Sequence, residues 1–119
     1  MKVLIVDDMA TTRVVLKTFL KQLGQVLEAS GGIPALHLCA EQKFDVIISD
    51  LNMKDMSGLS LLQRLNDQGV LEQTRFYLVS TDPLSPEDIA ELKNIGLSGY
   101  VRKPFVKEDI IGIVRGEND

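Results

Sequence analysis

The sequence predicts a doubly wound α/β fold, in which helices cover both faces of a parallel β-sheet. Residues 3–6 and 46–48 are aliphatic without polar alternation, which is typical of strands buried on both faces of such a sheet. Elsewhere apolar residues recur at helical spacing, as Val15, Phe19 and Leu23 do. Strands that alternate with helices favour a parallel sheet with right-handed crossovers. We expect one domain over residues 1–119.

The first half of the chain contains three predicted strands and two predicted helices. The strands lie at residues 3–6, 25–29 and 44–50. The first helical pattern starts at Thr12, and we expect Gly24 to end it. A turn at residues 30–32 precedes Pro34, which suits the first turn of a helix that continues to about Gln42.

The second half contains two predicted strands and three predicted helices. The strands lie at residues 75–80 and 99–102, and the helices at about 59–68, 86–95 and 107–115. Gly69 and Gly96 follow two of these helices and supply their stops. Ser85-Pro86-Glu87-Asp88 is a strong helix-start signal. In it a serine can cap, proline suits the first position, and acids face the positive end of the helix dipole.

Composition excludes several classes of function. The net charge of −4 disfavours a domain that binds nucleic acid by neutralising phosphates. The longest apolar runs have about four to five residues, far fewer than the roughly 20 that span a membrane. The single cysteine, Cys39, permits no internal disulfide, which favours a reducing cytoplasm. Cys39 and the only histidine, His37, lie in a helical pattern, and we expect neither to carry chemistry.

Polar side chains follow four of the predicted strands at the point where each strand ends. They are Asp7 and Asp8, Asp50, Ser80 with Thr81, and Lys103. The carboxyl ends of parallel strands meet at one edge of a sheet, where open α/β folds bind their ligands. Each residue alone has an ordinary structural explanation, such as a turn or a helix cap. Their convergence on one edge is much harder to explain in that way.

Three carboxylates in one crevice require a cation. Each like-charge pair at about 4 Å costs roughly 4 kcal/mol at an effective dielectric constant near 20. Oxygen-only ligands favour Mg²⁺ before Ca²⁺, because Mg²⁺ shares its shell with water and phosphate. Three aspartates, one Mg²⁺ and Lys103 sum to zero charge (−3, +2 and +1). The set suits phosphoryl transfer, in which one carboxylate would become an acyl phosphate while Lys103 and the Ser80 hydroxyl contact the phosphoryl oxygens.

Five short motifs follow one another along the chain: Val6-Asp7-Asp8, Ser49-Asp50, Met56-Ser57-Gly58, Val79-Ser80-Thr81 and Lys103-Pro104-Phe105. This ordered set resembles the receiver domain of two-component response regulators over nearly the whole chain. The resemblance implies a flavodoxin-like sheet of strand order 2-1-3-4-5 with five helices. It implies that Asp50 is phosphorylated, and that Asp8, Asp50, the Asn52 backbone carbonyl and, through water, Asp7 hold Mg²⁺. The peptide bond before Pro104 is often cis in this family.

The resemblance further implies a phosphorylation switch rather than a conventional enzyme. The donor would be a histidine kinase or a histidine phosphotransfer protein, and the domain would catalyse only its own phosphoryl transfer and dephosphorylation. Ser80 and Tyr100 would couple phosphorylation to a face made of the fourth helix, fifth strand and fifth helix. Candidate positions on that face are Ile89, Lys93, Tyr100 and Arg102. A downstream protein or effector domain would bind there, with no direct nucleic-acid or membrane contact.

Several positions depart from the family pattern or modify it. Lys54 stands where the family frequently has proline, and residues 31–34 replace a polar turn that we place far from the chemistry. Asp82 adds a negative charge near the edge. In the family, that position and Asn52 influence how fast the acyl phosphate hydrolyses.

Two other functions compete with the switch. A flavodoxin-like redox carrier shares the architecture, but Asp7 and Asp8 would repel a flavin phosphate and the chain has no tryptophan to stack on the ring. A degenerate receiver would serve only as an interaction module. The complete set of acids, Ser80 and Lys103 argues against it.

Overall fold

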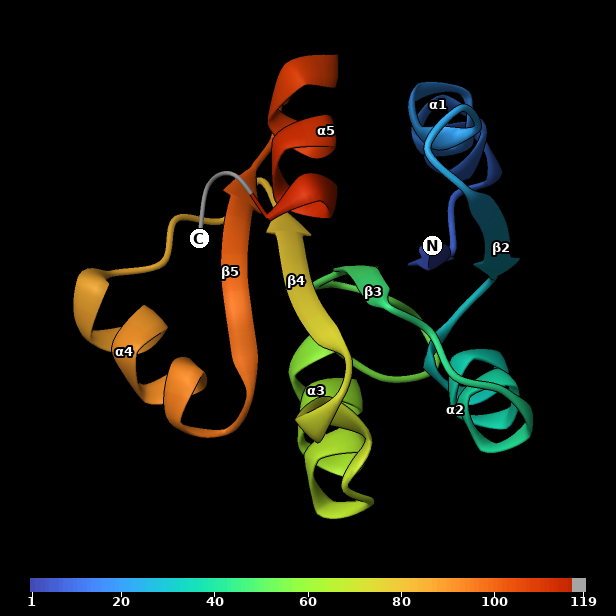
Figure 1. The fold of residues 1–119 in the computed structure, drawn as a ribbon. Coiled ribbons are helices and arrows are strands. Elements are labelled where there is room, and N and C mark those ends of the chain that lie inside the picture. Colours follow the sequence, from blue (N-terminus) through green and yellow to red (C-terminus); the bar gives the residue numbers. More distant parts are fainter. Residues whose placement is uncertain (117–119) are drawn as a thin grey trace.

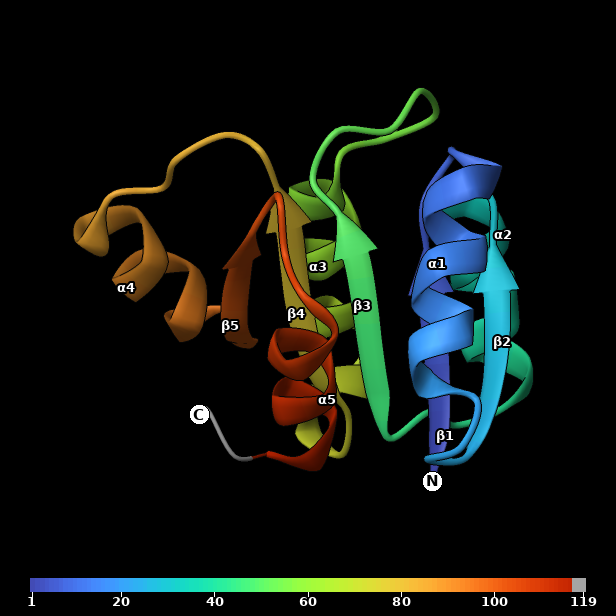
Figure 2. The same cartoon turned by 90° about the horizontal axis from the view of Figure 1, so that it is seen from above.

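The five predicted strands form one parallel sheet with the order β2-β1-β3-β4-β5. The computed structural model describes residues 1–116. The strands are β1 (Lys2–Val6), β2 (Gln25–Ala29), β3 (Val46–Asp50), β4 (Arg75–Ser80) and β5 (Leu97–Arg102). Figure 2 shows their carboxyl ends pointing the same way, toward the loops that follow β3 and β4. The predicted fold class and strand order are confirmed.

Five α-helices surround the sheet. They are α1 (Ala10–Leu20), α2 (Gly32–Glu41), α3 (Gly58–Asp67), α4 (Pro86–Asn94) and α5 (Lys107–Arg115). A short 3₁₀ helix, η1 (Val70–Glu72), links α3 to β4 and was not predicted. Figure 1 shows α1 and α5 on one face of the sheet and α2 and α3 on the other, with α4 beside β5.

The apolar strands form two cores because successive side chains point to opposite faces. Val3 and Ile5 of β1 pack with α1 and α5, whereas Leu4 and Val6 pack toward α2 and α3. The same alternation continues through β3 and β4. The absence of polar alternation in these strands therefore follows from burial on both faces.

Some element boundaries differ from the sequence-based ones. α1 starts at Ala10, β3 at Val46 and β5 at Leu97, each two residues away from its predicted start. Gly24 is not a helix-ending residue, since α1 ends at Leu20. A Cβ at Gly24 would instead collide with the carbonyl oxygen of Met1. Close approach of the two backbones therefore explains this glycine.

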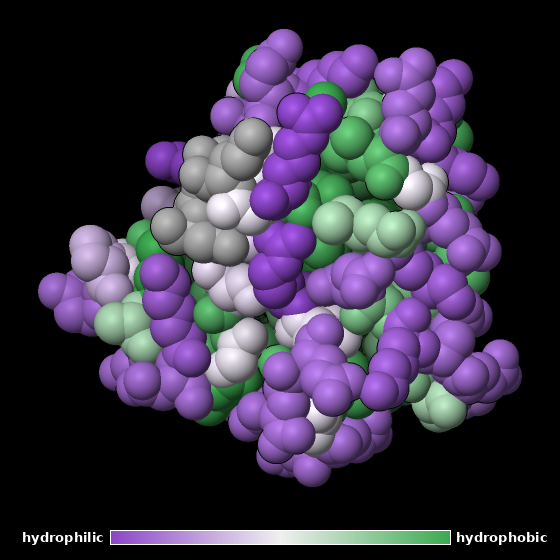
Figure 3. Space-filling model, viewed as in Figure 1, coloured by the Kyte–Doolittle hydropathy of each residue, from purple (hydrophilic) through white to green (hydrophobic). Residues whose placement is uncertain are grey.

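The surface carries both polar and apolar areas. Figure 3 shows polar residues over most of one side, with apolar atoms between α1 and α5. His37 is exposed on α2, and Cys39 of the same helix is half-buried. No helix within residues 1–116 has both the length and the apolarity needed to cross a membrane.

Candidate functional site

Three carboxylates meet at the carboxyl ends of β1 and β3. Asp7 and Asp8 follow β1, and Asp50 is the last residue of β3. Each contributes an oxygen that lies within 4.8 Å of the others. Asp7 is 2 % exposed, whereas Asp8 and Asp50 are half-buried. The predicted acidic cluster is therefore present.

Backbone groups hold the two β1 carboxylates in place. Oδ1 of Asp7 accepts a hydrogen bond from the Met9 N–H at 2.9 Å. Oδ2 of Asp8 accepts one from the Lys54 N–H at 3.0 Å. Lys54 belongs to the β3–α3 loop, so this loop reaches across the sheet edge to Asp8. Proline, which is frequent at this position in the resembled family, could not donate this bond.

Lys103 brings positive charge to the cluster from the end of β5. Its Nζ atom lies 3.3 Å from Oδ1 of Asp50 and 3.9 Å from Oδ2 of Asp7. Its backbone N–H donates to the Ser80 carbonyl at 2.8 Å, which ties it to the end of β4. The Lys103–Pro104 peptide bond is cis, as the resemblance implied.

The cluster carries more negative charge than Lys103 can balance. Burial raises the pKa of Asp7, and the Asp50 and Asp8 carboxylates raise it further, while the Met9 hydrogen bond and Lys103 lower it. The pKa of Asp7 is raised overall, so ionisation of this carboxyl is less favourable than that of a free aspartate. Oxygen donors at this spacing fit a hard divalent cation such as Mg²⁺. Asp7, Asp8 and Asp50 are the residues that would hold it.

Ser80 lies at the same edge, at the end of β4. It is 1 % exposed, and its Oγ accepts a hydrogen bond from the Asp82 N–H at 3.0 Å. The hydroxyl keeps its own proton to donate. Thr81, the neighbouring candidate, is exposed.

Tyr100 connects β5 to the loop after β4. Its hydroxyl donates to the carbonyl oxygen of Ser80 at 3.3 Å and to that of Asp82. Burial raises the pKa of Tyr100, and the nearby Asp82 carboxylate adds to this, against the lowering effect of Arg102. The ring is half-buried against the core on the α2–α3 face. The Tyr100 hydroxyl therefore has hydrogen-bond partners within the protein.

Asn52 lies beside the cluster, in the β3–α3 loop. Its exposed side-chain amide donates to Oδ2 of Asp82 at 3.1 Å. This contact joins the two residues that the resemblance links to acyl-phosphate lifetime. It involves only the side chain of Asn52, so its backbone carbonyl remains a predicted ligand.

Sequence reasoning missed two groups that support the site. The Arg13 guanidinium donates to the Asp7 carbonyl at 2.7 Å and pairs with Glu28 at 3.2 Å. Asp55 of the β3–α3 loop binds the first amides of α2. The turn at residues 31–34 is therefore in contact with this loop, and placing it far from the chemistry was wrong. The pair Gly31-Gly32 without a capping side chain was the available signal.

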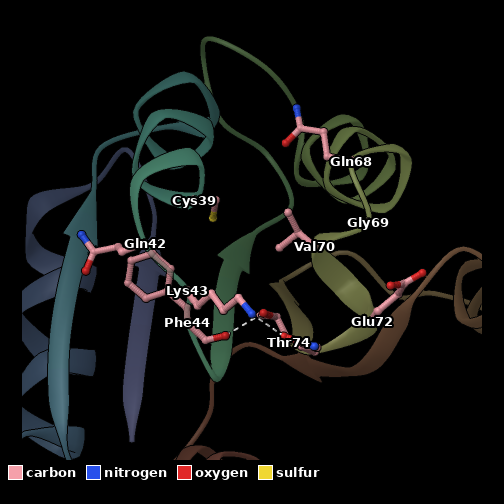
Figure 4. Close-up of a pocket in the computed structure, with 10 residues that line it drawn as sticks. Cys39, Gln42, Lys43, Phe44, Gln68, Gly69, Val70, Glu72 and Thr74 are labelled. Atoms are coloured by element: carbon pink, nitrogen blue, oxygen red, sulfur yellow. Dashed lines mark hydrogen bonds between the residues drawn. The ribbon is translucent and has the colours of Figure 1, made fainter.

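Two hollows differ in their relation to the cluster. One of about 480 Å³ adjoins it and is lined by Lys103, Pro104, Phe105 and residues of α1. Another of about 340 Å³ includes Cys39, Lys43, Phe44 and Glu72 in its lining. Figure 4 shows Thr74 and Lys43 at this second hollow, where Thr74 donates to the Phe44 carbonyl at 2.6 Å. No predicted site residue lines the second hollow, so it lies outside the candidate site.

Comparisons with known proteins agree with the geometry. The family model described as the response regulator receiver domain matches residues 3–115. Chemotaxis protein CheY1 of Helicobacter pylori is 35% identical over 125 residues, covering 100% of both chains. Chemotaxis protein CheY-3 of Vibrio cholerae is 35% identical over 107 residues, covering 88% of this chain and 82% of its own.

Solved structures give the same result. Chemotaxis protein CheY4 of Vibrio cholerae superposes with a TM-score of 0.87 at 34% identity, covering 97% of this chain and 96% of its own. The receiver domain of Francisella response regulator 1452 has a TM-score of 0.87 at 31% identity, covering 98% and 94%. These matches decide against the flavodoxin-like redox carrier. The chain belongs to the response regulator receiver domain family of two-component signalling.

Proposed function

We propose that this receiver domain accepts a phosphoryl group on Asp50 in a Mg²⁺-dependent reaction, and that phosphorylation changes which protein it binds. The observation that carries the proposal is the position of Lys103, 3.3 Å from Asp50 within a cluster of three carboxylates. A structural ion pair needs one acid. Here the lysine faces two acids, and a third lies beside them, which leaves charge for a divalent cation to balance.

The chemistry is a displacement at phosphorus. A carboxylate oxygen of Asp50 forms a bond to phosphorus while the P–N bond of a phosphohistidine breaks, and the released imidazole keeps the electron pair. Small acyl phosphates would serve as donors by the same route, with a P–O bond breaking. The donor protein is a histidine kinase or a histidine phosphotransfer protein. The change in charge on the acceptor is modest, because an acyl phosphate of about −2 replaces a carboxylate of −1.

Each residue at the edge has a role in this reaction. Asp7, Asp8, Asp50 and the Asn52 carbonyl would hold Mg²⁺, which supplies positive charge to the phosphoryl oxygens when bound. The Lys103 ammonium forms an ion pair with the Asp50 carboxylate before the reaction and with the phosphoryl group after it. The Ser80 hydroxyl donates a hydrogen bond to a phosphoryl oxygen. These contacts position and neutralise the transferred group, which is most of what phosphoryl transfer requires.

The output face is made of α4, β5 and α5. Tyr100 belongs to β5, and its hydroxyl donates to the Ser80 and Asp82 carbonyls, which supports a link from the proposed phosphorylation site to this face. None of the α4 residues is fully buried, which is consistent with a helix that can shift at low cost. Lys93 and Arg102 are exposed on this side. Movement of Ser80 toward a phosphoryl group would alter the carbonyls that Tyr100 binds.

Acetyl phosphate with Mg²⁺ tests the proposal directly. Intact-protein mass spectrometry should show a gain of about 80 Da, the mass of one phosphoryl group, which Asp50→Asn and EDTA should each abolish. Asp67→Asn, an exposed aspartate at the end of α3, is the matched control and should keep the gain. A mass gain by the Asp50→Asn protein would refute the acceptor assignment. No gain by the unmodified protein would favour an interaction module.

A further inference from the structure

The N-terminus of α2 is capped by a residue from another part of the chain. The N-cap residue, Gly31, offers no side chain, and the first turn contains no acid. Oδ1 and Oδ2 of Asp55 instead accept hydrogen bonds from the Gly32 N–H at 3.1 Å and the Ile33 N–H at 2.8 Å. These amides belong to the first turn, which has no partners within the helix. A carboxylate there also complements the helix dipole.

The glycines before α2 leave the space that this contact needs. A Cβ at Gly31 would lie 2.6 Å from Oδ2 of Asp55, and one at Gly32 would collide with Met56. The φ angle of Gly31 is 176°, which is extended backbone that any residue can adopt. Space rather than conformation therefore explains Gly31. Both glycines are buried beneath the β3–α3 loop.

The same loop segment is bonded to the acidic cluster. Lys54 donates its N–H to Asp8 at 3.0 Å, and the next residue, Asp55, binds α2. Asn52 lies two residues before Lys54 and interacts with Asp82 on the other side of the cluster. Because Lys54 and Asp55 are adjacent, Asp8 and the first turn of α2 are bonded to the same two-residue segment of the loop.

We infer that Asp55 is a positioning residue that couples Mg²⁺ binding at the acidic cluster to the order of the α2 N-terminus; the inference rests on the proposed function. Asp55 is not one of the three clustered carboxylates that would hold the metal. It holds the loop whose Lys54 amide orients Asp8 and whose Asn52 carbonyl is a predicted ligand. Binding coupled in this way is reciprocal. Loss of the α2 contact weakens Mg²⁺ binding, and Mg²⁺ binding strengthens the α2 contact.

Amide exchange measured by NMR gives a direct readout of the contact, apart from phosphorylation. In the unmodified protein the Gly32 and Ile33 amides should be protected in EDTA and more protected in MgCl₂. Asp55→Ala should remove protection in both conditions and weaken Mg²⁺ binding about fivefold, the scale of one lost helix cap. Asp55→Asn keeps one carbonyl acceptor and should give intermediate values. Mg²⁺ affinity is followed by chemical-shift titration.

Two further variants separate coupling from general loss of stability. Ser85→Ala removes the cap of α4, because the Ser85 hydroxyl accepts a hydrogen bond from the Asp88 N–H at 3.1 Å. It should expose the Asp88 amide and leave Mg²⁺ affinity unchanged. Gly31→Ala places a Cβ against the Asp55 carboxylate and should therefore weaken Mg²⁺ binding. In a protein that already carries Asp55→Ala, adding Gly31→Ala should weaken Mg²⁺ binding no further.

The outcomes are distinguishable. Unprotected Gly32 and Ile33 amides in the unmodified protein would overturn the contact itself. Normal Mg²⁺ affinity in Asp55→Ala, with those amides exposed, would overturn the coupling and leave the proposed function intact. Failure of the unmodified protein to bind Mg²⁺ would overturn the proposed function and the coupling together.

Discussion

The Nζ atom of Lys103 lies 3.3 Å from Oδ1 of Asp50, although 53 residues separate them in the chain. Asp50 ends β3 and Lys103 follows β5, and β4 lies between these strands. The contact therefore spans two strand spacings, roughly 9–10 Å, by means of a long lysine side chain. Lys103 therefore brings a positive charge from the end of β5 to the Asp50 carboxylate.

Removal of the Lys103 charge should have opposite effects on metal and phosphoryl binding. Lys103→Ala should bind Mg²⁺ several-fold more tightly, since a competing positive charge is lost. It should accept phosphate from acetyl phosphate about tenfold or more slowly, since a donor to the phosphoryl oxygens is lost. Mg²⁺ titration and time-resolved mass spectrometry measure the two effects.

The exposed Lys107 provides a matched control for this prediction. Lys107→Ala changes the net charge equally but lies at the start of α5. It should leave both quantities close to those of the unmodified protein. Parallel changes of the two quantities in Lys103→Ala would contradict the assigned role.

Neutralisation of Asp7 should stabilise the metal-free protein. Burial and the neighbouring carboxylates raise its pKa, so the ionised form is disfavoured in the folded state. In EDTA near pH 7.5, Asp7→Asn should raise the free energy of unfolding, measured by thermal or urea denaturation. The raised pKa means that the difference is largest above the folded pKa and closes below the unfolded value of about 3.9. A lower melting temperature for this variant would contradict the charge argument.

The cap supplied by Asp55 should make stability depend on pH in the opposite sense. Hydrogen bonds from the Ile33 amide first, and from the Gly32 and Met56 amides, lower the pKa of Asp55. Its stabilisation is therefore complete above the unfolded pKa and is lost as pH falls through the folded pKa. Asp55→Ala should cost about 1 kcal/mol at pH 7, and this cost should shrink as the pH falls below about 4.

A cap that does not titrate provides the comparison. Ser57 caps α3 by accepting from the Ser60 N–H at 3.1 Å. The cost of Ser57→Ala should stay constant over the same pH range, because a serine hydroxyl does not ionise there. Denaturation curves of both variants between pH 3 and pH 7 test the difference. Equal pH dependence of the two costs would refute the assignment to Asp55.

Cys39 should react slowly with thiol reagents. Burial raises its pKa to about 11 from an ordinary value of 9.0, and the thiolate is the reactive species. At neutral pH its alkylation should be about a hundredfold slower than that of a free thiol. The rate should rise with pH up to about 11. Rapid labelling at pH 7 would show that the helix opens or that the thiol is exposed.

Much of the fold was predictable because its signals are local. The unbroken aliphatic runs at β1 and β3 required burial on two faces, and the predicted start signal at Ser85 does cap α4, in a capping box with Asp88. Gly69 and Gly96 adopt positive φ values of 77° and 104° after their helices. Gly24 misled the prediction, because its spacing after a helical pattern resembles a stop. Its actual constraint comes from Met1, which is distant in sequence.

The sequence by itself determined the alternation of strands and helices and which residue types stand at strand ends. It thereby determined that Asp7, Asp8, Asp50, Ser80 and Lys103 share one edge, since parallel strands all end on the same side. Only the tertiary structure decided which backbone amides orient those side chains. The Lys54 bond to Asp8 and the Asp55 cap on α2 join residues 46 and 22 to 23 positions apart. Such contacts depend on how loops fold over the sheet. The pair Gly31-Gly32 indicates that α2 lacks a cap of its own, but no local pattern identifies Asp55 or Lys54 as the partner.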